Sequence, residues 1–172
     1  MGNSKSINEL NADLFNPEEV DRFSDPKEAR KKAMDYLARR EYGQQELVRK
    51  LCKAGFYNDV STAAVTQLTA DSLQDDRRFI ENFIQSRISQ GKGPVRIEMD
   101  LGERGLSSGL VAEILDESEQ DWFELAREVR CKKFGDKVPG DFNARAKQMR
   151  FLQYRGFEQA HIQSAVSAHG ED

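Results

Sequence analysis

The chain has 172 residues, of which 38% are hydrophobic and 33% are charged, and its net charge is −4. This length suits one domain or an array of small units, and the absence of any run of about 18 apolar residues excludes a typical membrane-spanning helix. The first residues lack the apolar core of a signal peptide, so we expect a cytoplasmic protein whose two cysteines, Cys52 and Cys131, stay reduced.

The first 26 residues form the acidic part of the chain. They contain two basic and six acidic residues, so this stretch accounts for the whole net charge. Asn16, Pro17 and Glu18 suit the start of a short helix, because asparagine caps helices, proline fits the first turn and acids oppose the helix dipole. We expect most of residues 1–26 to be a mobile tail, whose acidity either serves solubility or screens basic surface elsewhere in the chain.

A first helical unit is predicted over residues 27–70, with helices at 27–40, 44–54 and 58–70. Apolar residues recur there at steps of three and four, and Gly43 and Gly55 separate the helices. The predicted inner face of the first helix holds Ala29, Ala33, Tyr36 and Leu37. With nine basic and five acidic residues, this unit is the basic one.

The second unit, residues 71–117, contains the clearest helical pattern. Asp75 stands at the N-cap position, and the apolar face that follows consists of Phe79, Ile80, Phe83, Ile84 and Ile88. Gly91 ends this helix, while Gly93 and Pro94 form a hinge that opens a second helix, because proline is pre-set for a first helical turn. That helix runs to Gly105, and a third is expected over residues 107–117.

Three glycines reveal an internal repeat, because Gly55, Gly105 and Gly156 are spaced by 50 and 51 residues. Each has an apolar residue four positions before it, one directly after it and another ten positions after it. The third unit is therefore predicted over residues 118–172, with Ser118 and Asp121 as a capping pair and a short tail at the end. Such small units need neighbours to complete their cores, which predicts an all-α, elongated and curved array; HEAT-like repeats are the alternative at this period.

Two blocks of sequence resemble the RecX family. The first runs from Asp75 to Ile97 and reads DDRRFIENFIQSRISQGKGPVRI. The second comprises Asp121 and Trp122, the KFG sequence from Lys133, and the sequence RFLQYRGF from Arg150 to Phe157. Relatives tend to have a Gly-aromatic-Leu-Asp-Asp turn where residues 71–76 here read DSLQDD, so the angle between the first two units transfers least well. The resemblance implies three tandem three-helix repeats and a regulator of the RecA recombinase that binds the groove of a RecA–DNA filament.

The residues themselves argue against an enzyme. His161 and His169 are the only histidines, and no histidine or cysteine pair has the spacing of metal ligands. Gly91, Lys92 and Gly93 follow a helix instead of a strand and lack the Ser or Thr of a phosphate-binding loop. We therefore predict no catalytic, cofactor or metal site and no small-molecule substrate.

The third helices of the units could be mistaken for DNA-recognition helices, but they contain no lysine or arginine. Basic residues instead gather on the first helices, the second helices and their links. We name nine of them the basic strip and predict that it binds the partner: Lys31, Arg39, Arg87, Lys92, Arg96, Lys132, Lys133, Arg150 and Arg155.

Two other interpretations of the basic strip stay open. Its side chains could simply solvate helix faces, as most exposed charges do. They could also grip phosphates directly, which would make the chain a sequence-neutral DNA-binding module; under the RecX interpretation, contact with single- or double-stranded DNA would be only weak.

Overall fold

The computed structural model describes residues 21–167, and within this range all regular elements are helices. A short 3₁₀ helix, η1, spans Arg22–Ser24. The first unit consists of α2 (Pro26–Leu37), α3 (Gln44–Lys53) and α4 (Asn58–Ala70), and the second of α5 (Asp76–Ser89), α6 (Pro94–Glu103) and α7 (Ser108–Glu117). The third unit consists of α8 (Trp122–Phe134), α9 (Phe142–Tyr154) and α10 (Gln159–Val166).

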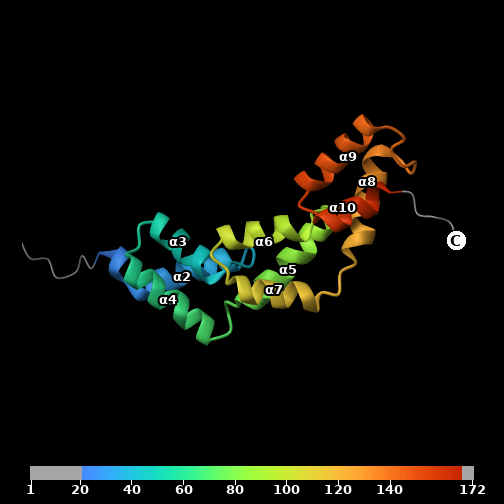
Figure 1. Cartoon of the computed structure of the whole chain (residues 1–172). Coiled ribbons are helices and arrows are strands. Elements are labelled where there is room, and N and C mark those ends of the chain that lie inside the picture. Colours follow the sequence, from blue (N-terminus) through green and yellow to red (C-terminus); the bar gives the residue numbers. More distant parts are fainter. Residues whose placement is uncertain (1–20, 168–172) are drawn as a thin grey trace, which may run out of the picture.

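The three units follow one another along an elongated body, with the first at one end and the third at the other (Figure 1). Each unit has its own cluster of buried apolar residues. The predicted all-α array of three tandem three-helix repeats is therefore confirmed. None of the helices between residues 21 and 167 combines the length and the apolar content needed to cross a bilayer.

The first unit differs from the prediction at the end of its first helix. Helix α2 ends at Leu37 and not at residue 40, so Tyr36 and Leu37 are only partly buried while Ala29 and Ala33 are fully buried. The chain turns early because Tyr42 is buried and packs near Tyr36, with 6.2 Å between the ring centroids. Burying that aromatic ring outweighs one more turn of exposed helix.

The second unit matches its sequence pattern closely. The Asp75 side chain accepts a hydrogen bond from the backbone N–H of Arg78 at 3.2 Å, as an N-cap should. Phe79, Ile80 and Ile84 are buried, and the two other residues of the predicted apolar face, Phe83 and Ile88, pack partly buried against the same core.

The capping pair predicted at the start of the third unit is wrong. Ser118 ends α7 as its C-cap, and its hydroxyl donates to the Leu115 carbonyl at 2.6 Å. The cap of α8 is Asp121 itself, which accepts from the backbone N–H of Glu124 at 2.9 Å. A capping pair needs both residues in one helical turn, but Glu119, between them, adopts a φ of 49°, which is not a helical conformation.

Equivalent glycines, Gly43 and Gly93, lie at the two joints between units, but only Gly93 brings two backbones into close contact. At the joint of the second and third units, the Gly93 N–H donates to the Arg155 carbonyl at 2.9 Å and the Val95 N–H to the Gly156 carbonyl at 3.0 Å. A Cβ atom on Gly93 would overlap the Gly156 carbonyl group, so only glycine permits this approach.

The joint of the first and second units uses side chains instead. The backbone N–H of Gln44 donates to the Asp76 carboxylate at 2.7 Å, and the buried Gln74 amide donates to the Tyr42 carbonyl at 3.1 Å. A Cβ atom on Gly43 would lie 3.2 Å from a methyl group of Leu106, a tight contact that a small shift of this side chain would relieve, whereas Gly93 meets backbone atoms.

The start of the described chain closes the free end of the first unit. Phe23 packs edge to face on Phe56 with centroids 5.6 Å apart, against the same glycine turn that meets a preceding unit in the other two repeats. The Tyr57 hydroxyl donates to Asp21 at 2.7 Å, which lowers the pKa of Asp21 and raises the pKa of Tyr57. Of the predicted tail, residues 21–25 thus join the fold; residues 1–20, with the helix expected at Asn16, lie outside the described residues.

Candidate partner-binding site

The third helix of each unit carries no basic residue of its own. As the structure bounds them, α4, α7 and α10 contain no lysine or arginine. These helices therefore lack the side chains that usually hold DNA phosphates and guanine edges. From Pro26 onward, the described lysines and arginines lie on the first two helices of the units and on the links between helices.

Three residues of the basic strip stand alone. Lys31 is exposed on α2, Arg39 is exposed just beyond its end, and Arg150 is exposed on α9. None of the three forms an ion pair with another described residue. They are accessible to a partner, but the structure does not gather them into one site.

Four other residues of the strip come together at the joint of the second and third units. Arg87, Arg96 and Arg155 all act on Lys92, whose pKa is lowered first by partial burial and then by these three positive charges. Asp100 offsets them in part, since it lies 2.9 Å from Arg96 and 3.6 Å from Arg87. The cluster therefore carries an excess of positive charge that an anionic partner would relieve.

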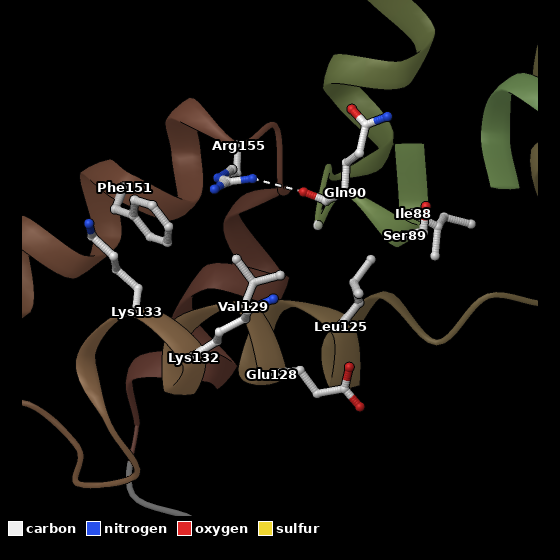
Figure 2. A pocket seen from close by; sticks show the side chains of 11 residues that line it. Ile88, Ser89, Gln90, Leu125, Glu128, Val129, Lys132, Lys133, Phe151 and Arg155 are labelled. Carbon is white, nitrogen blue, oxygen red and sulfur yellow. Dashed lines mark hydrogen bonds between the residues drawn. The ribbon is translucent and has the colours of Figure 1, made fainter. Parts of the chain in front are cut away.

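A pocket of about 630 Å³ opens beside this cluster, between the C-terminal end of α5 and the helices α8 and α9 (Figure 2). We call it the joint pocket. Its apolar lining comes from Ile88, Leu125, Val129 and Phe151, and its basic lining from Lys132, Lys133 and Arg155, with Glu128 as the acidic residue.

Arg155 links the cluster to the joint pocket. Its guanidinium donates to the Gln90 carbonyl at 2.8 Å, which ties the third unit to the end of α5 (Figure 2). The same guanidinium lies 5.3 Å from the ring of Phe151, and that ring packs edge to face with Phe134. In contrast, Lys132 and Lys133 are exposed and form no ion pair among the described residues.

The sequence did not reveal the apolar part of this pocket. Ile88 looked like an ordinary core position at the end of a helical stripe, and Leu125, Val129 and Phe151 belong to the third unit more than 35 residues later. The available signal was Gly91, where a Cβ atom would crowd Val129, but sequence alone does not say which residue a glycine faces.

His161, the one histidine among the described residues, is engaged in contacts within the fold. His161 is 7% exposed, its Nδ1 accepts from the backbone N–H of Glu158 at 3.3 Å, and its ring packs against Phe123. It therefore caps α10 and fills space. In the part of the chain that the structure describes, no three His, Cys, Asp or Glu residues gather closely enough to hold a metal ion.

Fold and surface together define the class of protein: a helical-repeat protein of three stacked three-helix units. Sequence profiles described as the first, second and third three-helix domains of RecX match residues 29–68, 75–115 and 119–166. The chain belongs to the RecX family.

Relatives in several bacteria support this membership. The chain is 39% identical to "Regulatory protein RecX" of Halorhodospira halophila over 81% of this chain and 87% of that one, and 42% identical to its counterpart in Pseudomonas fluorescens over 83% and 92%. Crystal structures share the fold at low identity. One of a regulatory protein RecX has a TM-score of 0.70 at 17% identity over 96% of this chain and 80% of that one. Another, of RecX from Lactobacillus salivarius, has 0.69 at 18% over 82% and 94%.

Proposed function

We propose that this chain binds the RecA protein and the RecA–DNA filament, and that it mainly inhibits ATP hydrolysis, recombinase activity and strand exchange. Relatives named as regulatory proteins support a regulatory role. The resemblance of the sequence to the RecX family supplies RecA as the partner.

One observation carries the proposal: six residues of the basic strip are concentrated along one joint of an elongated body. The members are Arg87, Lys92, Arg96, Lys132, Lys133 and Arg155. A long protein with such a surface suits a long, negatively charged partner, because complementary charge steers association and fixes orientation. A helical filament of RecA on DNA has both properties.

The inhibition follows from occlusion. A rigid, curved body in the groove of the filament would contact more than one protomer and fill the space that a second DNA needs. It would also hinder the addition of further protomers. The chain itself catalyses nothing in this scheme, so ATP turnover falls because the filament is blocked or shortened.

The decisive experiment compares a nucleoprotein filament with naked DNA. We expect the protein to lower ATP hydrolysis and strand exchange by RecA in a concentration-dependent way, while it binds naked single- or double-stranded DNA weakly. Tight binding of naked DNA with a steep salt dependence, and no preference for the filament, would identify a sequence-neutral DNA-binding module instead.

A further inference from the structure

We propose that the joint pocket is the anchor site for an acidic segment of the partner protein, which inserts one apolar side chain between α5, α8 and α9. This inference rests on the proposed function for the identity of the partner. The pocket would add one anchoring apolar contact to the electrostatic attraction that is spread along the basic strip.

The first argument concerns the exposed apolar surface at the base of the joint pocket, which we call its floor. Ile88, Val129 and Phe151 are only partly buried, so they leave apolar surface in water inside a concave site. Covering such surface is favourable, and pockets of several hundred Å³ hold compact apolar groups. Buried apolar anchors in pockets carry much of the binding energy of protein interfaces. The lining therefore suits a branched or aromatic side chain, and the volume is large enough to hold it together with neighbouring parts of the segment.

Charge around that floor is the second argument. Lys132 and Lys133 stand on the α8 side and Arg155 on the α9 side, against the single acid Glu128 (Figure 2). Lys92 lies close enough to Arg155 for the two charges to interact, and its pKa is lowered by burial and by its basic neighbours. The cations flank the floor from two sides, so carboxylates both before and after the inserted side chain would find partners.

The same features argue against a DNA strand as the occupant. Phosphates need cations but make no use of an apolar floor. A base would need an aromatic face for stacking, and the lining offers Phe151, which already packs with Phe134 and lies under the Arg155 guanidinium. The pocket between α6, α7 and α10 is instead lined by the acids Glu98, Asp116, Glu119 and Glu158. The pocket along α3 has three basic residues, Arg49, Lys50 and Lys53, but Val48 is its one aliphatic side chain.

Two variants test separately how the positive charges and the apolar floor contribute to binding. Lys132→Glu with Lys133→Glu reverses two exposed charges, and Val129→Thr keeps the shape of the floor but makes it polar. The matched control is Lys53→Glu with Lys147→Glu, which changes the net charge equally at two exposed lysines outside the strip. Circular dichroism checks that every variant keeps its helices.

The first measurement is binding to RecA free of DNA. We expect the double charge reversal to weaken binding at least tenfold and Val129→Thr to weaken it about threefold to tenfold, with the control within twofold of the parent. If Val129→Thr binds RecA as the parent does, the pocket anchors nothing and the inference is overturned.

A second measurement keeps the inference testable if RecA does not bind at all, which would contradict the proposed function. The probe is a labelled peptide, Glu-Glu-Phe-Asp-Asp, together with the same peptide carrying alanine in place of phenylalanine. The parent should bind the phenylalanine peptide several-fold more tightly, and Val129→Thr should remove that difference. Equal binding of both peptides by the parent would overturn the pocket as an anchor site, and a preference for single-stranded DNA over both peptides would assign the surface to nucleic acid.

Discussion

At the scale of single residues, Lys92 shows a conflict between stability and binding. Its pKa is lowered by partial burial and by three neighbouring arginines, which means that the folded state disfavours its positive charge. Such a residue destabilises the protein while it stays charged. The binding role proposed for the basic strip would explain why a positive charge stands in so basic an environment.

The corresponding variant is Lys92→Gln. It should raise the free energy of unfolding by a few tenths of a kcal/mol at neutral pH, since the charge is only partly buried and solvent screens it, and it should weaken partner binding. The destabilisation by Lys92 is fully present below its folded pKa and disappears above the ordinary lysine value, so the gain should shrink as pH rises through 10.5. Denaturant melts at pH 7 and pH 11 measure this. Lys147→Gln, at an exposed site away from the cluster, is the control; a loss of stability in Lys92→Gln would contradict the argument.

Arg130 is a second residue whose role appears only in the structure. It is 2% exposed, and its guanidinium donates to the carbonyls of Gly135, Asp136 and Lys137 at 3.0 to 3.2 Å. The residue thereby holds the chain between α8 and α9 in place. Sequence offered no signal for this, because an arginine near a helix end normally points into solvent.

Removing this guanidinium should loosen the α8–α9 connection. Arg130→Met keeps the bulk but leaves the carbonyls without their donor, so the unfolding free energy should fall by about 1–3 kcal/mol. Hydrogen exchange should speed up around residues 135–141. Arg127→Met, one turn earlier and exposed, should cost less than about 1 kcal/mol. Equal protection of this segment in both variants would show that Arg130 does not organise it.

At the scale of elements, the sequence predicted the helices well and misplaced some of their ends. Helix ends were predicted correctly where one residue determines the end by itself. Asp75 caps the start of α5, and Gly91 ends this helix with a φ of 72°. Errors arose where tertiary packing decided, as at α2, which stops early so that Tyr42 is buried. The prediction that Ser118 caps α8 was wrong. Its spacing to Asp121 fits a capping pair, but the positive φ at Glu119 separates the two residues into different turns of the chain.

Two glycines, Gly93 at the N-cap of α6 and Gly102 inside this helix, allow a paired test of the close approach between units. Gly93→Ala places a methyl group against the Gly156 carbonyl, so it should force the second and third units apart and reduce inhibition and thermal stability. Gly102→Ala, in the same helix with nothing within 4 Å of the added atom, should stabilise the protein by about 0.5–1 kcal/mol. Thermal melts and small-angle scattering compare the two. Identical curves for Gly93→Ala and the parent would remove the close approach as a structural requirement.

At the scale of the whole molecule, the period of the glycines predicted three units and their order. It did not predict how the units meet, because each joint depends on contacts between residues far apart in sequence. The Asp76 carboxylate, for example, finds its donor 32 residues earlier at Gln44. For the same reason the basic strip was predicted residue by residue, whereas the pocket beside it was not.

The strip as a whole makes a prediction of its own. Because exposed charges contribute on the order of 1 kcal/mol or less each, single alanine substitutions should weaken inhibition of RecA only modestly. Replacing all nine together should abolish inhibition while circular dichroism shows unchanged helix content: Lys31, Arg39, Arg87, Lys92, Arg96, Lys132, Lys133, Arg150 and Arg155. Should the ninefold variant stay folded and inhibit like the parent, the strip is a solvated face and binding belongs to the acidic third helices.

The two joints also differ in how substitution can change them. The joint at Gly93 has two backbone hydrogen bonds, which substitution of other side chains does not remove, in addition to the bond from the Arg155 side chain to Gln90. The other joint depends on Asp76, Gln74 and their acceptors and donors, each of which one substitution can remove. We therefore expect substitutions to change the angle between the first and second units more easily than the angle between the second and third. The orientation of the first unit would then vary among relatives while the two units that line the joint pocket keep their arrangement.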